Sequence, residues 1–167
     1  MKHYVLNKEG QWGGAPFTDL FIVGVKRGAG GSSDFTADDT TQTLTLTGLD
    51  IGDVVAYPAQ AWVKQKFTDA AAEGGAPATL ADLKADVGVT AALTQFIAGT
   101  DGDLINDPDY PIAPAAGGGP YPIQAASKEV LLTLTSSAGD MSTITFGELW
   151  IYLSLLRVAQ FSTSRYA

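Results

Sequence analysis

The chain has 167 residues and a mass of 17.4 kDa, which fits a single domain. Its 18 acidic residues outnumber its 10 lysines and arginines, and the net charge of −8 argues against a protein that binds nucleic-acid phosphates. The absence of cysteine excludes disulfides, thiol nucleophiles and cysteine-ligated zinc, and a single histidine, His3, excludes sites built from several histidines. We therefore expect no cofactor.

Neither a secretory leader nor a membrane span is predicted from the sequence. The first nine residues lack the apolar run that leader peptides carry. The longest apolar run, residues 149–158, is interrupted by Ser154 and Arg157 and has about half of the ~20 residues that a membrane helix needs. We expect a protein that is soluble as synthesised and that has no membrane partner.

Alternation of apolar and polar residues, which is the period of a β-strand, dominates the chain. In chain order it predicts strands at residues 20–25, 43–47, 54–57, 61–67, 82–89, 93–98, 129–136, 142–146 and 148–155. The clearest is 82–89, whose leucine, alanine and valines share one face while two aspartates and a lysine share the other. Short strands separated by glycine, proline, asparagine and aspartate turns predict an all-β fold, an antiparallel β-sandwich of jelly-roll type.

The segments between and beyond these strands are predicted to be irregular. Residues 1–19 are expected to form an N-terminal arm, residues 20–158 the single domain, and residues 159–167 a C-terminal tail. Residues 101–124 contain five prolines and form a long Pro/Gly-rich loop, of a kind that is usually functional or makes extended contacts. The alanine-rich residues 68–81 are predicted to form a second long loop with room for one helical turn.

Three aspartates at the start of the proline-rich loop are the candidate metal ligands. Asp101, Asp103 and Asp107 are close enough in sequence for their carboxylates to bind one calcium ion. The spacing of a calcium-binding loop is not met, because the sixth position is not glycine and the twelfth is Ile112 instead of glutamate. Aspartate, asparagine, glycine and proline also form turns, so a solvated turn is favoured and no metal site is predicted.

Aromatic residues are the other candidates for function. Trp62, Trp150 and Tyr152 have the ring chemistry of a sugar-binding platform. Both tryptophans lie within predicted strands, however, so a place in the core or at a subunit interface is favoured. The residues expected at interfaces lie in the arm, the proline-rich loop, the last strand and the tail, and they are Trp12, Phe17, Tyr110, Tyr121, Trp150, Tyr152, Phe161 and Tyr166.

An enzyme is not predicted. A glycosidase needs two positioned carboxylates, and Glu148, in a predicted strand beside aromatic residues, is the foremost candidate among the four glutamates. The sequence identifies no partner acid for it. The hypothesis of a hydrolase would be contradicted if no activity were found, or if Glu148→Gln and Asp103→Asn left all measured activity unchanged.

Several segments follow one another in the order found in a known family. They are Gly52-Asp53-Val54-Val55, then Val63-Lys64-Gln65-Lys66-Phe67, then the alternating residues 83–89, then residues 129–135, and finally Gly147-Glu148-Leu149-Trp150-Ile151-Tyr152. Over residues 20–158 this order of strands and turns resembles the small jelly-roll structural proteins of tailed bacteriophages, particularly capsid decoration (cement) proteins. The arm at 1–19 and the loop at 101–124 depart from the pattern.

The resemblance implies a non-enzymatic virion protein that forms a homotrimer and stabilises the phage head by bridging neighbouring subunits of the major capsid protein. Such a protein is made in the host cytoplasm and is located on the outer surface of the capsid in the virion. The low proportion of charged residues, 17%, and the threonine-, alanine- and glycine-rich surface independently suit a chain that packs against its own copies. The alternative is a carbohydrate- or receptor-binding β-sandwich module of a phage fibre or lectin-like protein.

Overall fold

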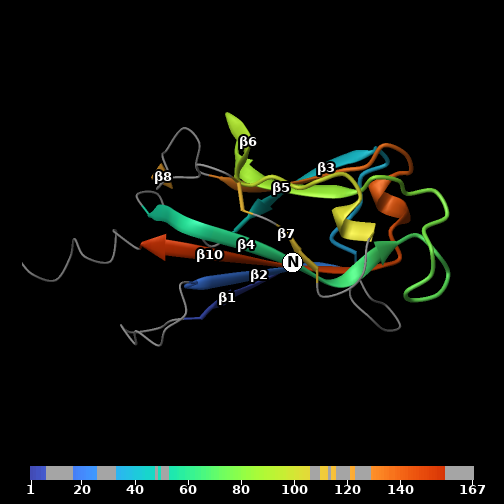
Figure 1. Ribbon diagram of the computed structural model, residues 1–167, viewed down its shortest axis with the longest axis horizontal. Coiled ribbons are helices and arrows are strands. Elements are labelled where there is room, and N and C mark those ends of the chain that lie inside the picture. The colour runs from blue at the N-terminus through green and yellow to red at the C-terminus, as the bar shows by residue number, and fades with distance from the viewer. Residues whose placement is uncertain are drawn as a thin grey trace, which may run out of the picture.

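The chain folds into two antiparallel β-sheets that form two layers (Figure 1). The computed structural model describes residues 1–6, 17–25, 33–47, 49, 53–105, 110–112, 114–115, 121–122 and 129–156. No helix in this described part of the chain is long and apolar enough to cross a membrane. The two antiparallel sheets confirm the prediction of an all-β chain.

One sheet has six strands in the order β1-β2-β10-β4-β7, and β8 also pairs with β4. Strand β10 lies at its centre and pairs with β2 on one side and β4 on the other. The strand bounds are Lys2–Val5 for β1, Asp19–Gly24 for β2, Val54–Thr68 for β4, Tyr110–Ile112 for β7, Tyr121–Pro122 for β8 and Phe146–Leu156 for β10.

The other sheet has four strands in the order β3-β9-β5-β6. Their bounds are Thr41–Leu46 for β3, Lys84–Val89 for β5, Ala92–Ile97 for β6 and Val130–Thr135 for β9. Two short 3₁₀ helices, η1 at Asp103–Ile105 and η2 at Met141–Thr143, lie in the connections. Several connections pass from one sheet to the other, so the two sheets are built by interleaved parts of the chain.

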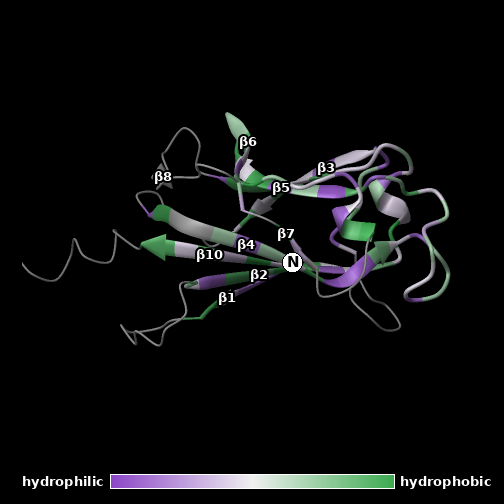
Figure 2. Cartoon of the chain, viewed as in Figure 1, coloured by the Kyte–Doolittle hydropathy of each residue, from purple (hydrophilic) through white to green (hydrophobic). Residues whose placement is uncertain are grey.

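The hydrophobic core lies between the sheets because side chains alternate between the two faces of each strand. On β10, Leu149, Ile151 and Leu153 point inward and are fully buried. Leu132 and Leu134 of β9 belong to the same cluster of buried residues. Figure 2 shows hydrophobic and hydrophilic residues interspersed along the strands of both layers, as this alternation requires.

Three of the predicted strands differ in the structure. The predicted strands 54–57 and 61–67 are parts of one strand, β4, in which Pro58 lies where the pairing with β10 shifts register. Proline cannot donate a ladder hydrogen bond, so it is tolerated in a strand only where the pairing is irregular, as it is here. The predicted strand 142–146 is wrong, since residues 141–143 form η2, closed by the Thr143 and Ile144 amides donating to Asp140 and Met141 carbonyls.

Part of the expected N-terminal arm belongs to the six-stranded sheet. Strand β1 pairs with β2 in register Lys2↔Ile22 to Val5↔Asp19. The His3 ring stacks on Phe21 at 4.3 Å between centroids, and its Nε2 lies 2.6 Å from Oδ1 of the buried Asp19. These two contacts attach β1 to the domain, and the sequence pattern alone does not indicate them.

Apart from Thr68, the last residue of β4, the predicted loop at 68–81 contains neither a strand nor a helix, as expected. It is closed by the Asp69 carboxylate, which accepts hydrogen bonds from the Ala78 amide at 2.6 Å and from the Thr79 amide at 2.7 Å. The Thr79 hydroxyl donates to the same carboxylate. Burial acts to raise the pKa of Asp69, but the hydrogen bonds from Thr79 and Ala78 together outweigh it and lower the pKa below its ordinary value of 3.8.

Replacing Asp69 with alanine should lower the free energy of unfolding at neutral pH by about 1 kcal/mol, because three donors lose a charged acceptor. The carboxylate has a lowered pKa in the folded state, so its contribution is present above pH 3.8 and is lost as the pH falls through the folded-state pKa. Urea unfolding of the wild type and of Asp69→Ala, at neutral pH and well below pH 3.8, measures how their difference in free energy of unfolding depends on pH. A difference in stability that is equally large at both pH values would contradict the assignment.

Gly147 is required at the start of β10 for a steric reason. It has a φ of +150°, and a Cβ built on it would overlap the ring of the buried Phe67. We expect Gly147→Ala to lower the free energy of unfolding by about 2–4 kcal/mol through overpacking and backbone strain. Gly102→Ala is the matched control, because Gly102 also has a positive φ, of +85°, but no atom lies within 4 Å of the place that a Cβ would occupy. Chemical denaturation should show a clearly smaller loss for the control, and equal losses would refute the clash.

Candidate functional site

The two sheets present chemically different outer faces. On the four-stranded sheet, Thr43 of β3 pairs with Thr133 of β9, their hydroxyl oxygens 3.2 Å apart, and Thr41 pairs with Thr135 beside them. On the six-stranded sheet the corresponding face carries aromatic rings. Exposure of aromatic rings to water is unfavourable, and covering them with a ligand or partner would lower the free energy. This face is therefore the candidate functional surface.

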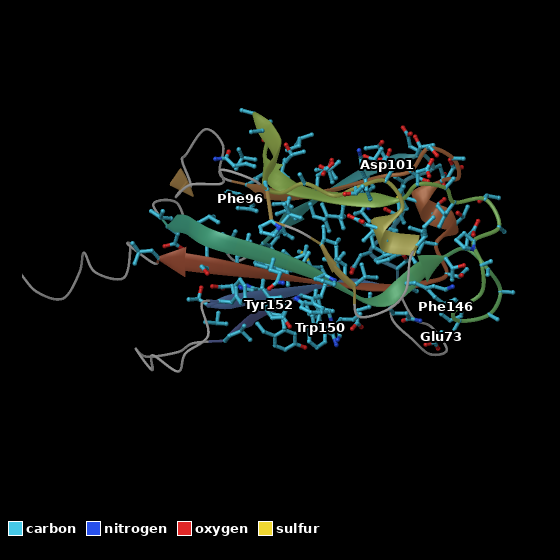
Figure 3. The ribbon with its side chains drawn as sticks, in the orientation of Figure 1. Glu73, Phe96, Asp101, Phe146, Trp150 and Tyr152 are labelled. Atoms are coloured by element: carbon cyan, nitrogen blue, oxygen red, sulfur yellow. The ribbon has the colours of Figure 1, made fainter. Side chains whose placement is uncertain are left out.

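Four residues form this surface, Phe17, Trp62, Trp150 and Tyr152, which we call the aromatic patch. Trp150 and Tyr152 alternate with the inward leucines and isoleucine of β10 and therefore point away from the core (Figure 3). Trp62 on β4 is the cross-strand partner of Trp150. The ring of Tyr152 lies 5.4 Å from that of Phe17 and 6.3 Å from that of Trp150. All four residues are half-buried.

Polar side chains fix the patch in place. The Trp150 indole Nε1 donates to Glu148 Oε1 at 2.6 Å. The Lys64 ammonium lies 5.4 Å from the centroid of the Trp150 ring, at cation–π distance. Glu148 and Lys64 both contact Trp150, and these two contacts hold its ring in one orientation.

A shallow groove of about 340 Å³ runs through the patch. It is lined by Phe17, Gln60, Trp62, Lys64 and Tyr152. Gln60 and Tyr152 are cross-strand partners, so β4 and β10 supply opposite sides of the groove. Burial raises the pKa of Tyr152, and the positive charge of Lys64 acts in the opposite direction. A tyrosine hydroxyl is already protonated at physiological pH, and this shift favours the protonated form further, so Tyr152 can donate a hydrogen bond.

The structure brings together three of the residues that the sequence placed at interfaces, namely Phe17, Trp150 and Tyr152. The side chains of the other predicted interface residues, Trp12, Tyr110, Tyr121, Phe161 and Tyr166, lie outside the described part of the structure. Trp62 and Trp150 are not core residues, since both are half-buried on the outer face.

Gln60 and Lys64 were missed as site residues. The sequence carries a signal for them, because Gln60, Trp62 and Lys64 are spaced two apart and so share one face of a strand. That face could be identified as the outer one only once the strand partners were known.

The two calcium candidates within the described residues, Asp101 and Asp103, have other partners. Asp101 is exposed and pairs with Lys84 at 3.2 Å, while the buried Asp103 accepts a hydrogen bond from the Thr100 amide at 2.7 Å. Asp107 lies outside the described residues. Within the described part of the chain no group of three or more His, Asp or Glu side chains is placed to hold a metal ion. Asp101 lies in the other layer from Trp150 and Tyr152 (Figure 3).

Glu148 and Asp103, the acids that a hydrolase would require, lie on different elements, β10 and η1. Glu148 faces outward and binds Trp150, whereas Asp103 is buried. The structure therefore does not pair them as a catalytic dyad.

Comparisons with known proteins give no relative: no family model, no curated protein and no solved structure matches the chain. The function must be inferred from the fold and the aromatic patch.

Replacing Lys64 with methionine should raise the pKa of Tyr152 further, because burial would then act without the opposing positive charge. The measurement is a pH titration of tyrosine ultraviolet absorbance, with Tyr152→Phe used to identify the signal. Lys2→Met on the exposed β1 is the control and should leave the titration unchanged. If Lys64→Met also leaves it unchanged, Lys64 does not act on Tyr152.

Proposed function

We propose that the chain is a jelly-roll virion structural protein without enzymatic activity, a decoration protein that stabilises a phage head by bridging neighbouring capsid subunits. The observation that carries this proposal is the order in which the strands pair. A jelly roll consists of eight strands and two Greek keys in two sheets, and it recurs in viral capsid proteins and lectins. It is equivalent to one long antiparallel hairpin wound into two layers.

The strand pairing supports this proposal because it follows a nested order. Without the additional strands β1 and β8, eight strands remain in chain order. The first pairs with the last, β2 with β10, and the second with the seventh, β3 with β9. The third pairs with the sixth, β4 with β7, and the fourth with the fifth, β5 with β6. An ordinary meander pairs each strand with its chain neighbours, so this order favours the jelly roll over other two-sheet folds.

The edges of the four-stranded sheet support assembly of several copies. Strands β3 and β6 are its edge strands. The end of β6 is covered, because Ile97 forms a bridge with Pro114 and the Ala115 amide donates to the Phe96 carbonyl. Residues 40–49 around β3 and residues 87–100 around β6 contain no charged side chain, although the chain as a whole carries a charge of −8. Soluble proteins usually protect an edge strand with charges or proline, because an unprotected edge pairs with other chains. Copies of this chain can approach one another here without charge repulsion.

The mechanism that follows is additive. A homotrimer presents each contact surface three times, so several weak contacts to capsid subunits act together. The shell can then come apart only after these contacts are broken. The aromatic patch lies on the other sheet and stays available in such an oligomer.

Light scattering coupled to size-exclusion chromatography tests the proposal. We expect a native mass of three times the 17.4 kDa of the chain. A lysine introduced on an edge strand, by Thr43→Lys on β3 or Leu93→Lys on β6, should shift the protein toward monomer. Leu93 is 41% exposed, so the change should leave the fold intact.

The matched control is Tyr4→Lys on β1, which is 45% exposed and lies in the other sheet, and it should leave the mass unchanged. A monomeric wild-type protein would contradict the trimer. Virions whose shells withstand heat equally well with and without the protein would contradict the bridging role.

A further inference from the structure

We propose that the groove of the aromatic patch is a carbohydrate-binding site that takes one or two pyranose rings, with a preference for sugars that carry a carboxylate. This activity goes beyond the proposed role in the shell. It rests on the geometry of the six-stranded sheet alone. It does not depend on the proposed pairing of copies through the edge strands β3 and β6.

The apolar part of the groove matches the apolar part of a sugar. A pyranose has a face of C–H groups and a rim of hydroxyls. The rings of Phe17, Trp62 and Tyr152 line the groove and supply apolar surface for the C–H face. The volume, about 340 Å³, lies at the lower end of the range for small-molecule sites, about 300–1,000 Å³, which suits a ligand of one or two rings.

The polar part of the groove matches the hydroxyl rim. The Gln60 amide both donates and accepts hydrogen bonds, as sugar hydroxyls do. The Tyr152 hydroxyl is protonated at neutral pH, as tyrosine ordinarily is, and it adds a donor and an acceptor. The Lys64 ammonium is the one charged group among the residues that line the groove, and its positive charge favours a ligand with a carboxylate.

The site is ordered before any ligand binds. Tyr152 contacts both Phe17 and Trp150, and Trp150 is fixed in turn by Glu148 and Lys64. Side chains that are already fixed lose little conformational entropy when a ligand binds, so a shallow groove can still bind usefully.

Other ligands of aromatic grooves fit less well. Nucleic-acid bases also stack on aromatic rings, but their phosphates require a positively charged groove, and here a single lysine lines the groove of a chain with a net charge of −8. A metal ion has no carboxylate among the lining residues. Sugar binding should therefore be independent of calcium.

Saturation-transfer NMR and tryptophan fluorescence test the proposal on the full chain. The probes are glucose, galactose, mannose, N-acetylglucosamine, glucuronic acid and N-acetylneuraminic acid. We expect saturable binding of at least one sugar, tighter for the acidic ones, and unchanged by a chelator. Trp62→Ala and Gln60→Ala should each weaken binding about ten-fold or more, because stacking and hydrogen bonding are lost separately.

Thr43→Ala, on the outer face of the other sheet, is the matched control and should bind as the wild type does. The native mass of every variant is measured in parallel. No transfer to any probe sugar, or equal binding by wild type and both groove variants, would overturn the proposal. So would a change of native mass in Trp62→Ala without sugar binding by the wild type, because the patch would then be a protein interface. Failure of the edge-strand trimer would leave sugar binding unaffected, so the two proposals fail separately.

Discussion

Strand β10 is the element on which the rest of the structure depends. It pairs with β2 along one edge and with β4 along the other, so its removal would divide the six-stranded sheet. Its inward residues, Leu149, Ile151 and Leu153, are fully buried against the opposite sheet. Because side chains alternate along a strand, the burial of these three fixes which residues face outward.

The aromatic patch follows from this single alternation. With Leu149 and Ile151 inside, Trp150 and Tyr152 must lie outside, and a slip of one residue would exchange the two sets. The Gly147 position at the start of the strand supports the register, since only a residue without Cβ fits against Phe67. The pairing of β4 then brings Trp62 beside Trp150 and Gln60 beside Tyr152. A groove with one wall from each strand is the result.

The two sheets are suited to different interactions. The four-stranded sheet has threonines on its outer face and uncharged edge strands, which favour main-chain pairing with other copies. The six-stranded sheet has rings, an amide and an ammonium on its outer face, which favour side-chain contacts with a ligand. A protein that assembles through one sheet keeps the other free, so assembly and ligand binding need not compete.

The sequence by itself determined the all-β class and the position of most strands, because the two-residue period of buried side chains is a local property. It also determined the absence of thiol and multi-histidine chemistry, and it indicated Phe17, Trp150 and Tyr152 as interface candidates. It did not reveal β1, because the residues of β1 carry no strand pattern and His3 is held by the distant Phe21 and Asp19. Only the tertiary structure decided which strands are neighbours, and hence that Trp62, Gln60 and Lys64 lie beside Tyr152. Pairing between strands far apart in sequence is set by burial of the whole core, which no local pattern contains.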